Sequence, residues 1–275
     1  MTSRYDGYMG KVLDINLSNG EIGEYPVSDE DRERFLGGRF LSTKIMWDEL
    51  APGIDPLSEE NILIVMTSPL TGTGAPSTSR YDISAKSPLT GAVGHSNSGG
   101  NFGIRLKRAG WDGMIVRGKA DKPVYIEVNQ DEIQIRDAKK LWGMDTQAAQ
   151  AALGKGGTLA IGPAGENRVK FATVVSQERS HGRTGMGAVM GSKNLKGVAL
   201  KGSRLVRVFD SEKFQEACRM AREDISVSEE CKVLTECGTS AAVPWSSAVG
   251  TLPYRNFQEQ GDPKADALGD EGQKK

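Results

Sequence analysis

A loop rich in glycine and hydroxyl groups ends at Arg80 and carries chemistry suited to an anion. The loop spans residues 68–80 and follows an apolar run, Ile62–Met66, that has the length and branching of a buried strand. Glycines expose backbone N–H groups, and a guanidinium binds phosphate or carbonyl oxygens through paired hydrogen bonds. The segment is therefore a candidate site for phosphate or for a carbonyl-rich heterocycle.

A second glycine-rich segment, residues 87–103, adds a candidate cation ligand. The side-chain oxygen of Asn97 is of the type that a hard cation such as magnesium prefers. Gly99 and Gly100 have no side chains, so a bulky ligand can lie against the backbone there. The segment indicates a magnesium ligand beside a point of close backbone approach.

A third glycine-rich segment, residues 179–194, begins with two arginines four positions apart, Arg179 and Arg183. Any one such loop is equally well explained as a tight surface turn, but three of them favour a ligand. The nucleotide-binding motifs do not fit, because no G-x-G-x-x-G opens a βαβ unit and Gly191-Ser192-Lys193 reverses the Walker A order. A nucleotide is therefore the weaker explanation.

The remaining titratable residues give weaker indications of catalysis. His95 and His181 are the only histidines, and neither has the H-x-x-x-H or C-x-x-C spacing of a zinc site. Asp112 and Glu166 are candidate acid–base groups, although single carboxylates in turns are usually structural. The cysteines, which lack the spacing of iron–sulfur ligands, are Cys218, Cys231 and Cys237. We expect no cluster bound by this chain alone.

Two regions of alternating polarity predict β-hairpins among the elements that must position these loops. Residues 10–25 turn at Ser18-Asn19-Gly20, and residues 124–135 turn at Asn129-Gln130-Asp131. The other predicted elements are helices at residues 28–36, 41–50 and 146–153 and strands at residues 62–66, 159–161, 171–175 and 198–200.

The periodicity changes to that of a helix after Asp210, where apolar residues within 214–221 share one face. We therefore expect an α+β protein in two parts. Residues 1–205 form a mainly antiparallel β-sheet N-terminal domain with short helices, and residues 206–275 form the truncated start of a helical second domain. Residues 258–275 are polar and have little to bury, so we expect the C-terminal end to be disordered.

Composition and charge exclude several classes of function. The 35 Lys and Arg against 36 Asp and Glu leave a net charge of -1, so no broad positive field favours a nucleic-acid partner. The longest apolar run is far shorter than the ~20 residues of a membrane span, and the N-terminus has no apolar signal segment. An odd number of cysteines suits free thiols in a reducing compartment. We expect a cytoplasmic protein without a membrane span.

Several short stretches of the sequence match the pattern of one known enzyme family. They are Pro69–Pro76, Lys86–Gly91, Asn97–Gly100, Gly162–Asn167 and Gly187–Lys196. In these stretches the chain resembles the tungsten-dependent aldehyde:ferredoxin oxidoreductase family. The resemblance covers the family's N-terminal domain from about residue 10 to residue 202, and it continues weakly into the residues that follow.

The resemblance implies a β-sheet base that holds a bis-pyranopterin cofactor, whose dithiolene sulfurs bind tungsten or molybdenum and whose phosphates meet at a magnesium ion. By position, Asn97 and the backbone carbonyl of Ser180 match the magnesium ligands. The residues that match pterin contacts are Arg80, Gly99, Arg179 and Gly182, and Gly100 joins them as the adjacent glycine. Arginines and backbone N–H groups would neutralise the phosphates. This agrees with the anion site that the glycine-rich loops and their arginines indicate by themselves.

The resemblance also implies a reaction, the oxidation of a small aldehyde to a carboxylic acid. Electrons would leave through a [4Fe–4S] cluster to ferredoxin or to an electron-transfer subunit in a homo- or hetero-oligomer. In the family, the cluster cysteines and the catalytic acidic residues lie in later helical domains. The cluster is therefore expected only in the complete protein, the catalytic residues are not assigned here, and this chain alone is expected to be inactive.

One departure from the family and two alternatives accompany this interpretation. Family members often carry Arg-Ala-Ala-Gly-Arg where this chain has Arg179-Ser180-His181-Gly182-Arg183, a change that a backbone contact survives. A relative with the same cofactor that reduces the ring of an aromatic acyl-CoA thioester is one alternative, although residues 73–76 resemble the aldehyde branch more closely. A non-catalytic module for cofactor binding or subunit interaction is the other.

Overall fold

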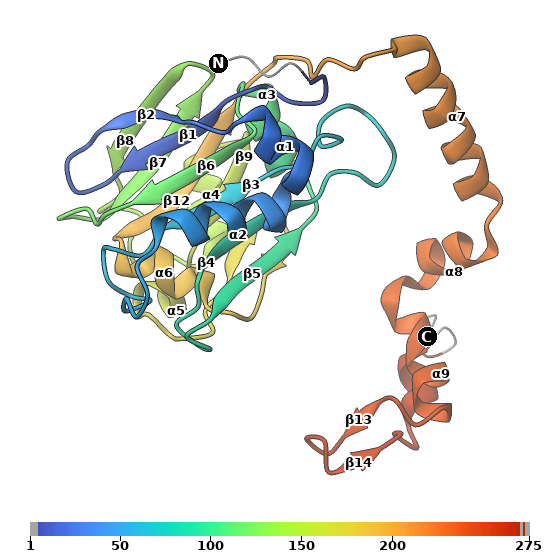
Figure 1. Cartoon of the computed structure of the whole chain (residues 1–275). Helices are drawn as coiled ribbons and strands as arrows, with labels where there is room; N and C mark the ends of the chain where they lie inside the picture. Colours follow the sequence, from blue (N-terminus) through green and yellow to red (C-terminus); the bar gives the residue numbers. More distant parts are fainter. Residues whose placement is uncertain (1–4, 270–271, 273–275) are drawn as a thin grey trace. The chain divides into compact units, whose positions relative to one another are not determined.

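Strands and short helices fill the first three quarters of the chain, and helices dominate the last quarter (Figure 1). The computed structural model describes residues 5–269 and residue 272 of the 275-residue chain. The chain forms two units, Met1–Asp210 and Ser211–Lys275. An α+β fold with a β-rich first part is confirmed, and the second part is largely helical.

The first sheet of the N-terminal unit has the strand order β2–β1–β6–β3–β4–β5. Its strands are β1 (Val12–Asn16), β2 (Ile22–Tyr25), β3 (Leu63–Met66), β4 (Tyr81–Lys86), β5 (Val93–Ser98) and β6 (Gly113–Arg117). β1 and β6 are parallel, whereas the other neighbours are antiparallel. The predicted first hairpin is confirmed as β1 and β2, with Val12 opposite Tyr25.

The second sheet has the order β11–β10–β9–β12–β7–β8. Its strands are β7 (Val124–Asn129), β8 (Glu132–Asp137), β9 (Gly157–Ala160), β10 (Val174–Ser176), β11 (Arg179–His181) and β12 (Leu195–Lys201). Only β7 and β12 are parallel among its described pairs. The second predicted hairpin is confirmed as β7 and β8, and the sheets are mainly antiparallel, as expected.

Short helices accompany the two sheets. They are α1 (Asp29–Phe35), α2 (Gly38–Glu49), α3 (Phe102–Arg108), α4 (Thr146–Leu153), α5 (Pro163–Glu166) and α6 (Met186–Ser192). The predicted cap of the first helix is confirmed, because the Ser28 hydroxyl accepts a hydrogen bond from the Asp31 N–H at 3.0 Å. The elements β4, β5 and α3 were not predicted, since they lie in a glycine-dense stretch without a clear apolar period. β6 was also not predicted, although Met114-Ile115-Val116 is a short apolar run.

Two apolar cores hold these elements together. The larger core lies between the two sheets and also receives side chains from α3 and α6. The smaller core lies on the other face of the first sheet, beneath α1 and α2, which cross that face in Figure 1. β3 supplies both cores, because Leu63 and Val65 enter the larger one and Ile64 and Met66 the smaller one. Because β3 is buried on both faces, its sequence is a continuous apolar run.

The glycines of the third glycine-rich segment serve helix packing. A Cβ atom added to Gly191 would lie 1.9 Å from the carbonyl oxygen of Gly165 in α5, and one added to Gly187 would lie 2.5 Å from the carbonyl oxygen of Thr173. Glycine therefore lets α6 lie directly on neighbouring backbone. The sequence favoured a ligand beside this glycine-rich segment. At Gly187 and Gly191, however, the glycines contact neighbouring protein backbone.

Asp112 and Glu166, the candidate acid–base groups, are both engaged in buried ion pairs. Lys107 Nζ lies 2.8 Å from Asp112 Oδ1 and also donates to the Gly7 carbonyl at 2.5 Å. Lys196 Nζ pairs with Glu166 and donates to a backbone carbonyl. Both lysine side chains have 0 % exposure, so the pairs are structural.

The C-terminal unit is largely helical. Its elements are α7 (Ser211–Val227), α8 (Glu229–Cys237), η1 (Gly238–Ala241), α9 (Ala242–Ala248), β13 (Pro253–Tyr254), β14 (Glu259–Gln260) and η2 (Ala265–Leu268). β14 and η2 lie in the stretch predicted to be disordered, and the rest of that prediction, residues 270–271 and 273–275, lies outside the described residues. Among the described helices, none is long and apolar enough to cross a membrane.

Lys193 offers a direct test of how buried charge supports the fold. Its Nζ donates to the carbonyl oxygens of Asn61 at 2.5 Å, Gly118 at 2.9 Å and Glu59 at 3.4 Å. Lys193→Met leaves these oxygens without their donor, so we expect a loss of about 3 kcal/mol in the free energy of unfolding, measured by urea denaturation.

Lys201→Met is the matched control, because that side chain is 60 % exposed. We expect this variant to change stability by less than about 0.5 kcal/mol. Equal losses of stability in the two variants would contradict a structural role for the hydrogen bonds from Lys193 to the three carbonyl oxygens.

Candidate functional site

The edge strands β5 and β11 bring predicted site residues from the two sheets side by side. His181 Nδ1 in β11 lies 2.8 Å from the carbonyl oxygen of Ser96 in β5. Asn97 follows Ser96, and Ser180 precedes His181. The two predicted magnesium ligands therefore each lie one residue from a contact that joins the sheets.

Arg80 reaches the same place from the first glycine-rich loop. It directly precedes β4, and β4 pairs with β5 so that Asp82 lies opposite Asn97. Its guanidinium Nη1 donates a hydrogen bond to Asn97 Oδ1, and both side chains are exposed. An amide oxygen has two lone pairs, so this bond orients Asn97 and leaves a lone pair for a cation.

The hydroxyl groups of that loop hold its own backbone. Thr73 Oγ1 donates to the Leu70 carbonyl at 2.7 Å, and Thr78 Oγ1 donates to the Ala75 carbonyl at 2.8 Å. Thr71 Oγ1 donates to the Arg80 carbonyl at 3.0 Å and so ties the start of the loop to its end. The threonines shape the loop that presents Arg80.

Arg179 lies against the Gly99–Gly100 backbone. A Cβ atom on Gly99 would lie 3.9 Å from Arg179 Cζ, and one on Gly100 would lie 3.3 Å from Arg179 Cδ. Gly100 also has φ +93°, a conformation that favours glycine. Gly100 admits an arginine from the second sheet, a contact that the sequence did not lead us to expect, whereas Gly99 only borders the arginine side chain.

Gly182 differs from these two glycines. A Cβ atom there would contact only Ser180 Oγ and Thr173 Cγ2, each at 3.9 Å. Protein crowding therefore does not require glycine at this position, and the space beside its backbone is open.

A cavity of about 480 Å³ adjoins Arg80 and Asn97, and the sequence analysis did not assign most of its lining. Residues 36–40 and 67–70 border it together with Tyr81 and Asp82. The second helix predicted at residues 41–50 begins earlier in the structure, because Gly37 caps α2 and Gly38 is its first residue, which places Arg39 at the cavity. In the sequence, the pattern that could have indicated this part of the cavity is two glycines directly before an arginine, Gly37-Gly38-Arg39.

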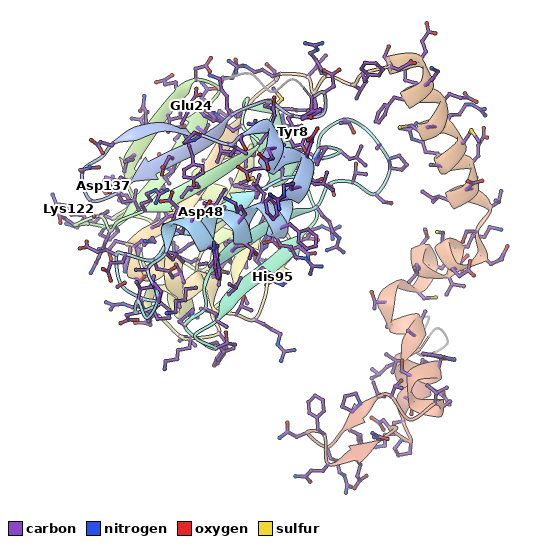
Figure 2. The ribbon with its side chains drawn as sticks, viewed as in Figure 1. Tyr8, Glu24, Asp48, His95, Lys122 and Asp137 are labelled. Carbon is purple, nitrogen blue, oxygen red and sulfur yellow. The ribbon has the colours of Figure 1, made fainter. Side chains whose placement is uncertain are left out.

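Asp82 contributes a buried carboxyl group to this cavity. Burial raises the pKa of Asp82 to about 6, although the Ser84 hydroxyl donates to it at 2.5 Å and His95 favours its charged form. His95 Nδ1 lies 3.8 Å from Asp82 Oδ2, and Figure 2 labels this histidine on β5. The cavity thus combines two guanidiniums, from Arg39 and Arg80, with one carboxyl group.

Comparison with known proteins decides the family. The family model described as "Aldehyde ferredoxin oxidoreductase, N-terminal domain" matches residues 12–202. This chain belongs to the aldehyde ferredoxin oxidoreductase family. The matched residues include every predicted site residue described above.

Curated aldehyde ferredoxin oxidoreductase relatives are closely similar but longer. The tungsten-containing aldehyde ferredoxin oxidoreductase of Pyrococcus horikoshii is 45% identical over 260 residues, which are 92% of this chain and 43% of the relative. The aliphatic sulfonate oxidoreductase, WOR-like subunit, of Pyrococcus furiosus is 37% identical over 281 residues, with 92% and 44% covered. The chain spans less than half the length of the curated relatives it matches.

A solved structure shares the fold of this family member. It is the active site complex BamBC of benzoyl coenzyme A reductase in complex with 1,5-dienoyl-CoA, with a TM-score of 0.82 and 31% identity. The match covers 96% of this chain and 43% of that one. Within residues 5–269 and 272, no group of three or more His, Cys, Asp or Glu side chains is placed to hold a metal ion.

Gly100 and Gly74 form a matched pair for testing the Arg179 contact. Both have φ +93°, but a Cβ atom on Gly74 would meet nothing within 4 Å, whereas one on Gly100 would lie 2.9 Å from Gln177 Oε1 and 3.3 Å from Arg179 Cδ. We expect alanine to cost about 1 kcal/mol at Gly74 from backbone strain alone. At Gly100 we expect about 1 kcal/mol more from crowding, measured by denaturation. Equal losses would show that neither Gln177 nor Arg179 crowds this backbone.

Proposed function

We propose that the natural protein containing this chain oxidises aldehydes to carboxylic acids and that residues 12–202 hold its tungsten bis-pyranopterin cofactor. The observation that carries the proposal is the family match over residues 12–202, whose predicted site residues converge where β5 meets β11. Its curated relatives include tungsten-containing aldehyde ferredoxin oxidoreductases at 42–45% identity.

The residues at this junction fit a cofactor with two phosphate groups. Arg80 directly precedes β4 of the first sheet and Arg179 lies in β11 of the second, and each guanidinium suits paired hydrogen bonds to phosphate oxygens. The Asn97 side-chain oxygen and the Ser180 carbonyl are hard ligands suited to magnesium. We assign these four residues to phosphate and magnesium binding.

Glycines provide the remaining contacts in this proposal. Gly100 lets Arg179 approach β5, and the open space beside Gly182 admits a ligand to the backbone. The 480 Å³ cavity beside Arg80 offers additional room bordered by Arg39 and Asp82. The surface is thus shaped for a large anionic group rather than for a free metal ion.

When bound, the tungsten centre would supply two-electron chemistry at the aldehyde carbon, and a [4Fe–4S] cluster in the complete protein would pass electrons to ferredoxin or a partner subunit. The contribution of this chain is to bind and orient the cofactor. Cys218 and Cys231 are free thiols, which supports assignment to the cytoplasm. We propose a homo- or hetero-oligomer, in keeping with relatives that are named as a subunit or a complex.

Reduction of an aromatic acyl-CoA thioester is the second candidate function. The structural match to the benzoyl coenzyme A reductase complex favours it, with a TM-score of 0.82. Its 31% identity is lower than the 45% shared with an aldehyde ferredoxin oxidoreductase, which places the aldehyde reaction first.

Arg80→Ala tests the assigned binding site. Loss of one guanidinium should reduce tungsten and pterin retained after anaerobic purification by about tenfold, because a charge-assisted hydrogen bond contributes roughly 1.5 kcal/mol. Metal analysis and the fluorescence of the oxidised pterin measure this content. Arg136→Ala is the control, because Arg136 is half exposed on β8 and pairs with Glu127. Equal cofactor content in both variants would remove Arg80 from the site.

Assays of the natural full-length protein separate the two functions. We expect benzaldehyde to reduce a viologen dye and benzoyl-CoA to show no ring reduction with a low-potential donor. The opposite pattern would favour the second candidate. Activity in neither assay, with tungsten and pterin present, would contradict both reactions while leaving the cofactor assignment intact.

A further inference from the structure

His181 is buried between two residues that face solvent or open space. Its side chain has 0 % exposure, whereas Ser180 is exposed and Gly182 is half-buried. The imidazole is therefore shielded from solvent at a point where its two neighbours are not.

The imidazole contacts both β4 and β5 of the first sheet from its place in the second sheet. Nδ1 lies 2.8 Å from the Ser96 carbonyl oxygen, and the ring lies 4.7 Å from the Tyr81 ring, centroid to centroid. Tyr81 in turn packs on Phe102 of α3 with centroids 5.1 Å apart. His181 is therefore held by a hydrogen bond to Ser96 and by a tilted ring contact with Tyr81.

The chemistry of the His181–Ser96 contact determines which atom donates the hydrogen bond. A carbonyl oxygen only accepts, so Nδ1 carries the hydrogen and donates it to Ser96. Nε2 is buried and has no hydrogen-bond partner among the described residues. The single hydrogen bond of this buried ring is thus the one that crosses between the sheets.

Two other hydrogen bonds join loops of the two sheets nearby. The Asn101 N–H donates to Gln177 Oε1 at 3.1 Å, and Ser87 Oγ donates to the Thr184 carbonyl at 2.7 Å. Both involve loop residues outside the strands. The His181 bond alone among these three joins residues of β5 and β11 themselves.

We propose that His181 is a positioning residue whose Nδ1–H bond to Ser96 sets the separation between Asn97 and the Ser180 carbonyl. The inference rests on the proposed function, which assigns these two groups to magnesium. Each group is one residue from the contact, and consecutive Cα atoms are about 3.8 Å apart, so little chain is available to absorb a shift. A few tenths of an ångström matter to a magnesium ion, which demands near-ideal geometry.

Two substitutions separate the hydrogen bond from the packing. His181→Asn keeps an N–H donor close to the position of Nδ1, whereas His181→Leu keeps apolar bulk and removes the donor. His181→Ala serves as the donor-free variant if leucine prevents folding. The thermal midpoint of each variant reports folding.

The readouts are hydrogen–deuterium exchange in residues 93–101 and 177–183 and the magnesium, pterin and tungsten content of the anaerobically purified natural protein. We expect His181→Leu to speed exchange in both segments and to lower cofactor content by about tenfold, the effect of one lost hydrogen bond. His181→Asn should stay within about threefold of the unmodified protein in both measurements.

Two results would overturn the inference. One is unchanged exchange and cofactor content in the donor-free variants, and the other is an equal loss in His181→Asn and His181→Leu, which would indicate packing alone. If the unmodified protein holds no pterin or tungsten, the proposed function fails. Exchange in the two segments would then still decide whether the hydrogen bond fixes β5 against β11.

Discussion

The packing of two six-stranded sheets on one apolar core is the constraint on which the site depends. β5 ends one sheet and β11 ends the other, and the shared core brings these edges together. Asn97 and Ser180 are 83 positions apart in sequence, yet each lies beside the Ser96–His181 contact. Each edge strand carries part of the site. A backbone shift in one sheet therefore moves its part of the site relative to the other, so the packing of the two sheets sets the geometry of the site.

Glycine is used in this chain for two distinct physical reasons. Gly191 and Gly165 let α6 and α5 touch through their backbones, with no room for a single additional carbon atom. Gly100 instead makes room for the side chains of Gln177 and Arg179, and Gly182 borders open space. Counting glycines in a sequence does not separate close packing from ligand access, since both require the absence of a Cβ atom.

Two residues of one stretch that resembles the family, Lys193 and Lys196, have structural roles that require no ligand. Lys193 and Lys196 belong to the stretch Gly187–Lys196 that resembles the family, and both are fully buried. Lys193 is satisfied by backbone carbonyls, and burial lowers the pKa of Lys193 to about 8, whereas Lys196 pairs with Glu166. Removing a charge from water is costly unless its donors are satisfied, so such residues restrict the fold strongly. These residues of the stretch support the base of the site rather than its chemistry.

The sequence by itself determined the hairpins at β1–β2 and β7–β8, the Ser28 cap and the family, because local alternation, turn residues and short motifs are encoded in adjacent positions. It also named Arg80, Asn97, Arg179 and Ser180 as candidates, through motif positions. Only the tertiary structure decided that these residues meet, that Arg39 and Asp82 border the adjoining cavity, and that His181 joins β5 to β11. The physical reason is that these contacts link distant segments, and their geometry is set by how the two sheets bury a common core.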